Sequence, residues 1–190
     1  INLIKNRGLA SKDYILTVGR LDPRKNLINM VRAYSLTSMK YPIVLVGQEG
    51  LRVNELYRTI DGLGINKKVF FINDADDTEL AALYRHAACF VFPSFAEGFG
   101  LPVLEAMASG IPVITSDSTS LPEVVGNAGI LVNPNNIEDI SKSIDNILNS
   151  KETANNLVKK GFVQLEKFSW EVSATKLSKF YIKMLNKPKD

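Results

Sequence analysis

The order of apolar and polar positions along the chain alternates between two patterns. Six short aliphatic or β-branched runs have the character of buried strands: residues 14–18, 43–46, 69–72, 89–92, 112–115 and 129–132. Between them, apolar residues recur three or four positions apart, which predicts amphipathic helices. Nearly continuous apolar strands indicate a sheet covered on both faces, and regular strand–helix alternation makes that sheet parallel. We therefore expect an α/β fold with a doubly wound, Rossmann-like sheet.

After residue 132 the strand pattern stops, and residues 137–148, 152–168 and 170–185 are predicted to form C-terminal helices. In the last helix five residues share one apolar face: Trp170, Ala174, Leu177, Tyr181 and Met184. We expect this face to dock against a core. Lys176, Lys179 and Lys183 lie off that face, where we expect solvent. A weaker alternative is contact of this basic face with anionic lipid.

Composition narrows the class of protein. The 190 residues carry a formal net charge of +3 with no dense basic block, so we expect no nucleic-acid partner. Cys89, the only cysteine, lies in an apolar run and indicates a core residue in a reducing compartment. We find no internal repeat, signal peptide or membrane-spanning run, and expect a single domain, residues 1–190. The chain opens on Ile1, which is compatible with a piece of a longer protein.

The most informative segment is residues 93–110, which follow a buried strand and enter a helix. Gly98 and Gly100 allow the backbone to bend tightly and to approach a ligand closely. The N–H groups around Phe99 and Leu101 lie at the predicted start of the helix, where the helix dipole favours anions. This segment therefore predicts an anion site suited to a diphosphate.

Two carboxylates flank this turn. Glu97 lies in the loop, and Glu105 lies about one turn inside the helix. A carboxylate accepts two hydroxyl hydrogen bonds at once, which suits the vicinal diols of a ribose or hexose. Taken singly, Glu105 could simply interact favourably with the helix dipole near the start of the helix, and Glu97 could be a solvated loop residue. Together, in a glycine-rich turn after a buried strand, they indicate sugar binding.

A second cluster, residues 19–26, follows the first strand. It places Arg20 and Lys25 at another strand's carboxyl end, where they could neutralise a diphosphate. They could equally pair with surface carboxylates. Asp22 or Asn26 could serve as a helix cap or turn former.

Glu97 through Glu105 resembles the glutamate–seven residues–glutamate motif of family 4 retaining glycosyltransferases, and Gly19-Arg20 with Lys25 resembles that family's phosphate-binding pair. Further similarity follows in the family's order at residues 45–47, 84–94, 110–114, 122–126 and 168–170. Such enzymes have the GT-B architecture, in which two Rossmann-like domains face each other across a cleft. The resemblance covers nearly the whole chain, but only the C-terminal, donor-binding domain of that architecture; the N-terminal acceptor domain is absent from this sequence.

The resemblance implies a role for each candidate residue. Arg20 and Lys25 would bind the donor diphosphate, and Glu97 would contact the transferred sugar. Glu105 would hold the ribose. Further contacts to the nucleotide sugar are implied for Gly19, Gly47, Ile72, Asn73, Gly98, Phe99, Gly100 and Leu101.

The function that the resemblance implies is retaining hexosyl transfer from a GDP- or UDP-sugar to a glycan or glycolipid in surface polysaccharide or lipopolysaccharide synthesis. We expect the isolated domain to be inactive, with no cofactor and no metal. We expect a cytoplasmic location, and peripheral association of the full-length enzyme with the inner face of the membrane is compatible with it. One alternative is a non-catalytic regulatory or scaffold subunit. A dinucleotide-dependent oxidoreductase is disfavoured because residues 19–24 lack the Gly-x-Gly-x-x-Gly fingerprint.

Overall fold

The computed structural model describes residues 2–38 and 40–186. In this part of the chain, parallel strands form a single six-stranded sheet in the order β3-β2-β1-β4-β5-β6. The strands are β1 (Ile15–Val18), β2 (Ile43–Val46), β3 (Val69–Ile72), β4 (Cys89–Phe92), β5 (Val113–Ser116) and β6 (Gly129–Val132). This is the strand order of a doubly wound Rossmann sheet, so the predicted fold class is confirmed. The first and fifth predicted strands begin one residue too early.

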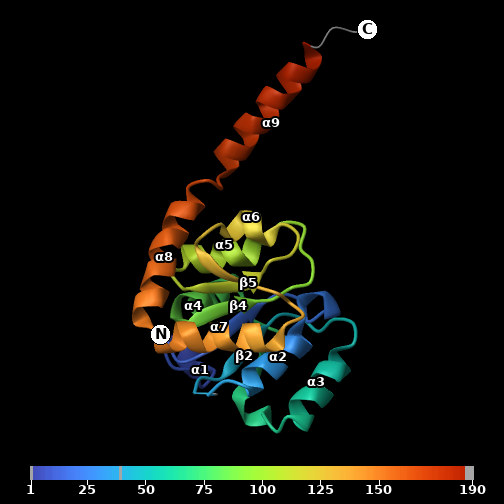
Figure 1. Ribbon diagram of the computed structural model, residues 1–190, viewed down its shortest axis with the longest axis vertical. Helices are drawn as coiled ribbons and strands as arrows, with labels where there is room; N and C mark the ends of the chain where they lie inside the picture. The colour runs from blue at the N-terminus through green and yellow to red at the C-terminus, as the bar shows by residue number, and fades with distance from the viewer. Residues whose placement is uncertain (1, 39, 187–190) are drawn as a thin grey trace.

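Helices cover both faces of the sheet (Figure 1). They are α1 (Asn2–Asn6), α2 (Leu27–Ser35), α3 (Val53–Gly62), α4 (Asp77–His86), α5 (Leu101–Ala108), α6 (Leu121–Val125), α7 (Ile137–Asn149), α8 (Lys151–Leu165) and α9 (Trp170–Leu185), with 3₁₀ turns η1 (Pro23–Lys25) and η2 (Asn66–Lys68). One core packs α1, α4, α5 and α6 against strand residues such as Leu16 and Phe90. The other packs α2, α3 and α7 against their neighbours, such as Ile15 and Val91. Successive strand residues thus alternate between the two cores.

The order of the strands places the topological switch point of the sheet between β1 and β4, which are neighbours in the sheet. The chain passes from β1 to α2 in one helix layer and from β4 to α5 in the other. The two connections therefore diverge at the carboxyl ends of the strands, which is where α/β sheets of this kind bind ligands. Residues 19–26 and 93–100, the two predicted site segments, are these connections.

Helix α9 leaves the body of the molecule (Figure 1). No residue of α9 is buried, and Trp170 is 86% exposed. The prediction that its apolar face docks against a core is therefore wrong for the described chain. A turn at residues 166–169 redirects the backbone after α8, and the Ser169 side chain caps the new helix by accepting from the Val172 N–H at 3.0 Å. Among the described residues, no helix is both long and apolar enough to cross a bilayer.

Candidate functional site

The loops after β1 and β2 are pressed together by two glycines. Gly19 and Gly47 both have positive φ angles, of 141° and 145°. A Cβ atom on Gly47 would overlap the backbone of Gly19, so a larger residue cannot stand there without separating the loops. The Gly19 N–H donates to the Val46 carbonyl at 2.9 Å, which links the loops further. Gly47 therefore has a structural role in addition to its predicted proximity to the nucleotide.

Lys25 and Glu97 meet at the switch point between β1 and β4. Lys25 Nζ donates to Glu97 Oε1 at 2.8 Å, and each side chain is 9% exposed. The ammonium group also lies 4.5 Å from the centroid of the Phe92 ring, a cation–π arrangement. A Cβ on Gly19 would lie 3.1 Å from Lys25 Cε, so glycine at this position leaves room for the lysine. The structure thus brings together two predicted site residues that are 72 positions apart.

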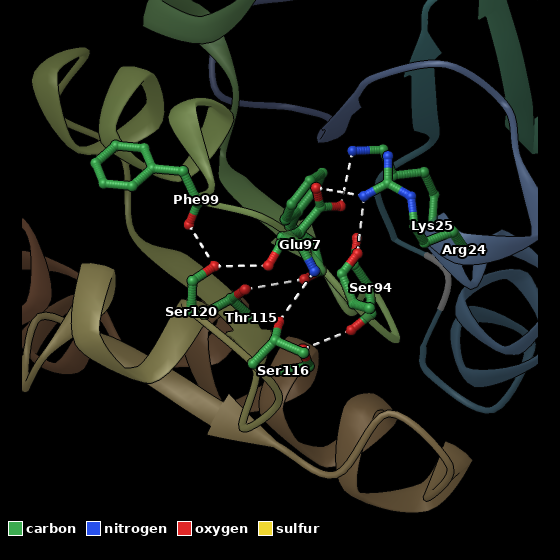
Figure 2. A network of polar contacts seen from close by, with 11 residues as sticks. Arg24, Lys25, Ser94, Glu97, Phe99, Thr115, Ser116 and Ser120 are labelled. Carbon is green, nitrogen blue, oxygen red and sulfur yellow. Dashed lines mark hydrogen bonds and ion pairs between the residues drawn. The ribbon is translucent and has the colours of Figure 1, made fainter.

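Arg24 is a site residue that the sequence did not single out. Its Nη1 donates to Glu97 Oε2 at 2.7 Å and to the Ala96 carbonyl at 2.8 Å (Figure 2). Its position beside Lys25 was the available signal, because residues 24 and 25 both stand in η1 at the switch point. Arg24 and Lys25 therefore occupy both oxygens of the same carboxylate.

These contacts keep Glu97 ionised. Burial raises the pKa of its carboxyl group, but the hydrogen bonds and charges of Lys25 and Arg24 outweigh burial, so the pKa lies below the usual value. Glu97 is consequently a fixed negative charge at the switch point.

Arg20 differs from its two neighbouring cations. Its side chain is exposed, and within residues 2–38 and 40–186 it forms neither a hydrogen bond nor an ion pair. Arg20 is therefore available to an incoming anion.

Asp22 and Asn26 precede η1 and α2 but do not cap them with their side chains. The Asn26 amide instead donates to the carbonyls of Pro93 and Pro134, at 3.0 and 2.6 Å.

Glu105 lies outside the Glu97 cluster. It is exposed, and its Oε2 accepts a 2.8 Å hydrogen bond from the Tyr84 hydroxyl of α4. Burial raises the pKa of Tyr84, and the charge and hydrogen bond of Glu105 raise it further, so the phenol remains a donor. The second glutamate of the motif is thus held by a neutral partner.

The segment between the two glutamates exposes Gly98, Phe99 and Leu101 but buries Gly100. Gly100, with φ of 114°, precedes α5, and a Cβ there would lie 2.8 Å from the Leu121 side chain. A Cβ on Gly98 would meet nothing within 4 Å, so packing within the described chain does not explain that glycine. Phe99 and Leu101 are 45% and 55% exposed.

The two candidates after β3 differ from each other. Ile72 is 4% exposed and belongs to the core beneath the site, and its carbonyl accepts from the Gly47 N–H at 2.8 Å. Its side chain is therefore not available to a ligand. Asn73 is exposed in the following loop.

A row of hydroxyl side chains supports the Glu97 loop from β5 and the residues after it (Figure 2). We call Thr115, Ser116, Thr119 and Ser120 the hydroxyl row. Each of them hydrogen-bonds a backbone group in the segment from Phe92 to Phe99, at 2.6 to 2.9 Å. The sequence analysis did not identify these residues. The signal was a run rich in serine and threonine, residues 115–120, at the end of a buried strand and in the loop that follows it.

No group of three or more histidine, cysteine, aspartate and glutamate residues in the described part of the chain could hold a metal ion. Cys89 is buried, and burial raises the pKa of its thiol to about 12.

Comparison with known sequences places the chain among sugar transferases. Residues 2–164 match the family described as glycosyl transferases group 1. The chain is 38% identical over 177 residues to O-antigen chain mannosyltransferase B of Escherichia coli, covering 91% of this chain and 46% of that protein. It is 35% identical over 182 residues to the serotype-specific mannosyltransferase WbdA of Escherichia coli, covering 92% of this chain and 22% of that protein. The chain spans less than half the length of these two relatives.

Two solved structures share the fold. Anabaena Alr3699/HepE, in complex with UDP and glucose, has a TM-score of 0.86 and 20% identity, covering 96% of this chain and 51% of that one. The C-terminal domain of the group 1 protein LpcC from Francisella tularensis has a TM-score of 0.77 and 26% identity, covering 87% and 90%. The switch-point site thus stands on a GT-B glycosyltransferase domain, and the chain belongs to the glycosyl transferases group 1 family.

Proposed function

We propose that this chain is the donor-binding domain of a retaining glycosyltransferase, which moves a sugar from a nucleoside diphosphate sugar to a glycan or glycolipid acceptor in surface polysaccharide synthesis. The observation that carries the proposal is the cluster of Lys25, Arg24 and Glu97 at the switch point, together with Arg20 of the same loop, whose side chain has no partner among the described residues. In this proposal the acceptor is bound by a second domain of the full-length protein.

The charges of the cluster fit a diphosphate. Arg24 and Lys25 both pair with the carboxylate of Glu97, which leaves one positive charge in excess, and the exposed Arg20 in the same loop after β1 adds a second. A nucleoside diphosphate sugar carries about two negative charges on its bridging diphosphate. Arginine can bind phosphate oxygens through two parallel hydrogen bonds, whereas lysine supplies a mobile charge. In our proposal these groups neutralise the diphosphate without a metal ion.

In our proposal, one of the two ion pairs of Glu97 breaks when the donor binds and the other remains. Lys25 turns from Glu97 towards the diphosphate, while Arg24 stays on Glu97 and keeps it ionised. Glu97 then accepts hydroxyl hydrogen bonds from the sugar and stabilises the positive charge that develops as the diphosphate leaves. Arg20 binds the departing diphosphate, and Glu105 accepts from the ribose diol in place of the Tyr84 hydroxyl.

Binding of nucleotides to this chain tests the proposal. UDP, GDP, UDP-glucose and GDP-mannose are titrated by calorimetry, because the relatives named above are mannosyltransferases and HepE is solved with UDP and glucose. We expect a micromolar dissociation constant for the nucleotides that carry one of the two bases, uracil or guanine. Arg20→Ala should weaken that binding about tenfold, since one charge-assisted hydrogen bond is lost. Arg32→Ala is the control: Arg32 is also exposed but lies on α2, so the affinity for the nucleotide should not change. No binding of any of the four nucleotides would overturn the proposal.

A further inference from the structure

Thr119 has a backbone conformation that threonine rarely adopts. Its φ is 54°, in the left-handed region, where a β-branched side chain is unfavourable. The residue is exposed, so packing does not impose this conformation. The conformation does place Thr119 Oγ1 where it accepts from the backbone N–H of Glu97 at 2.9 Å. Strain that persists at an exposed position points to a functional reason.

The next residue controls the direction of two peptide groups. Ser120 Oγ lies 2.9 Å from the carbonyl oxygen of Glu97 and 2.8 Å from that of Phe99 (Figure 2). The N–H groups that share these two peptide planes are those of Gly98 and Gly100. Both peptides are trans, so each N–H points to the side opposite its carbonyl, away from Ser120. Within the described residues, neither of these N–H groups donates to a protein acceptor.

We propose that Thr119 and Ser120 are positioning residues of the donor site. They hold the turn from Glu97 to Gly100 so that the N–H groups of Gly98 and Gly100 and the Glu97 carboxylate are presented together to the oxygen atoms of a nucleotide sugar. This inference rests on the proposed function. Donors that are already oriented need no rearrangement when the ligand arrives, so affinity is gained without new contacts.

The first measurement is amide hydrogen exchange at Glu97, followed by NMR in the unliganded chain. Thr119→Ala removes the acceptor of the Glu97 N–H and should speed its exchange about fivefold, the factor expected for one ordinary hydrogen bond. Thr119→Ser keeps the hydroxyl and should exchange like the wild type. Thr115→Val is the matched control, because its hydroxyl donates to Phe92 at 2.9 Å, within the strand pair rather than the turn.

The second measurement is the affinity for the nucleotide sugar that the wild-type chain binds among UDP-glucose and GDP-mannose. Thr119→Ala and Ser120→Ala should each weaken binding about fivefold or more, and Thr119→Ser should restore it. Thr115→Val should lower the unfolding temperature and leave affinity unchanged. If Thr119→Ala and Ser120→Ala bind the nucleotide sugar as tightly as the wild type does, the inference is overturned. It is also overturned if Thr119→Ser binds as weakly as Thr119→Ala, because the hydroxyl is then not what matters.

The outcomes separate the inference from the proposed function. If the wild-type chain binds no nucleotide, the proposed function fails, and so does the assignment of the turn to a donor. If the wild type binds and the variants bind equally well, only the positioning role of Thr119 and Ser120 fails. Unchanged exchange at Glu97 in Thr119→Ala also overturns the positioning role, independently of any ligand.

Discussion

The two glutamates of the motif, one before the start of α5 and one inside the helix, lie in opposite environments. The side chain of Glu97 is 9% exposed and is held by two cations. Glu105 is exposed and is held by one neutral phenol. Hydrogen bonds from two cations to a carboxylate are strong, so a competing partner must displace at least one of them to bind. A single hydrogen bond from a neutral phenol is weaker and can be replaced readily. The difference indicates that the side chain of Glu97 is fixed in one position, whereas the carboxylate of Glu105 can change its hydrogen-bond partner when a ligand binds.

The largest effect should follow removal of the Glu97 carboxylate. Glu97→Ala leaves Lys25 buried without a counter-ion, so the free energy of unfolding should fall by about 3 kcal/mol. Glu97→Gln keeps two hydrogen-bonding atoms and should lose about 1 kcal/mol. Urea unfolding measures both. In the full-length enzyme either change should reduce sugar transfer at least about 100-fold while nucleoside diphosphate still binds. Equal loss of transfer and nucleoside diphosphate binding would show that the two glutamates do not have separate roles.

The counterpart at Glu105 should affect binding more than stability. Glu105→Ala should weaken nucleoside diphosphate binding about tenfold, because two ribose hydroxyls lose a charged acceptor. Its free energy of unfolding should change by about 1 kcal/mol or less, since the carboxylate is exposed. Tyr84→Phe is the matched control: it frees Glu105 without removing it, so nucleotide affinity should not fall. Calorimetry on both variants decides this, and unchanged affinity in Glu105→Ala would remove the ribose assignment.

The ion pairs of Glu97 should also appear in the pH dependence of stability. Its pKa in the folded protein lies below the ordinary value of 4.5. The pairs therefore stabilise the fold fully above pH 4.5, and this stabilisation is lost as the pH falls through the lowered pKa. The advantage of the wild type over Glu97→Gln should be constant between pH 7 and pH 5 and should shrink below about pH 4.5. Urea unfolding at a series of pH values measures it, and a difference that grows in acid would contradict the ion-pair account.

The smallest effect concerns metal ions. If the cations beside Glu97 neutralise the diphosphate, EDTA should change nucleotide affinity by less than about twofold. Titration with and without the chelator, and again with added Mg²⁺, measures this. A large loss on chelation would show that the charge surplus at the first glutamate is insufficient.

The fold could be predicted from the sequence because its information is local. Each strand is a short apolar run, and the alternation with helices fixes a parallel sheet. The switch point then places residues 19–26 and 93–100 together, so the meeting of Lys25 and Glu97 follows from topology.

Other parts of the site depend on contacts that no pattern contains. Arg24 and Lys25 are adjacent cations, and only the turn of η1 brings both onto Glu97. The contacts of Thr119 and Ser120 depend on a left-handed conformation that sequence propensity disfavours for threonine.

The error at α9 has a different origin. Its apolar face was read correctly as a pattern, with Trp170, Leu177 and Tyr181 on one side of a helix. Periodicity states that such a face is apolar, but it does not state where a partner lies. The described part of the chain contains no surface that covers it.

The close approach of Gly47 to Gly19 has a consequence for redesign of this protein. The loop after β2 can be exchanged for that of another transferase only if the new loop also has glycine at position 47, because a Cβ atom there would overlap the backbone of Gly19. A graft intended to change which nucleotide is accepted must therefore keep this glycine or replace the loop after β1 as well. Recombination between related genes meets the same restriction: crossovers between residues 19 and 47 should yield folded products only when both parents share this pair of glycines.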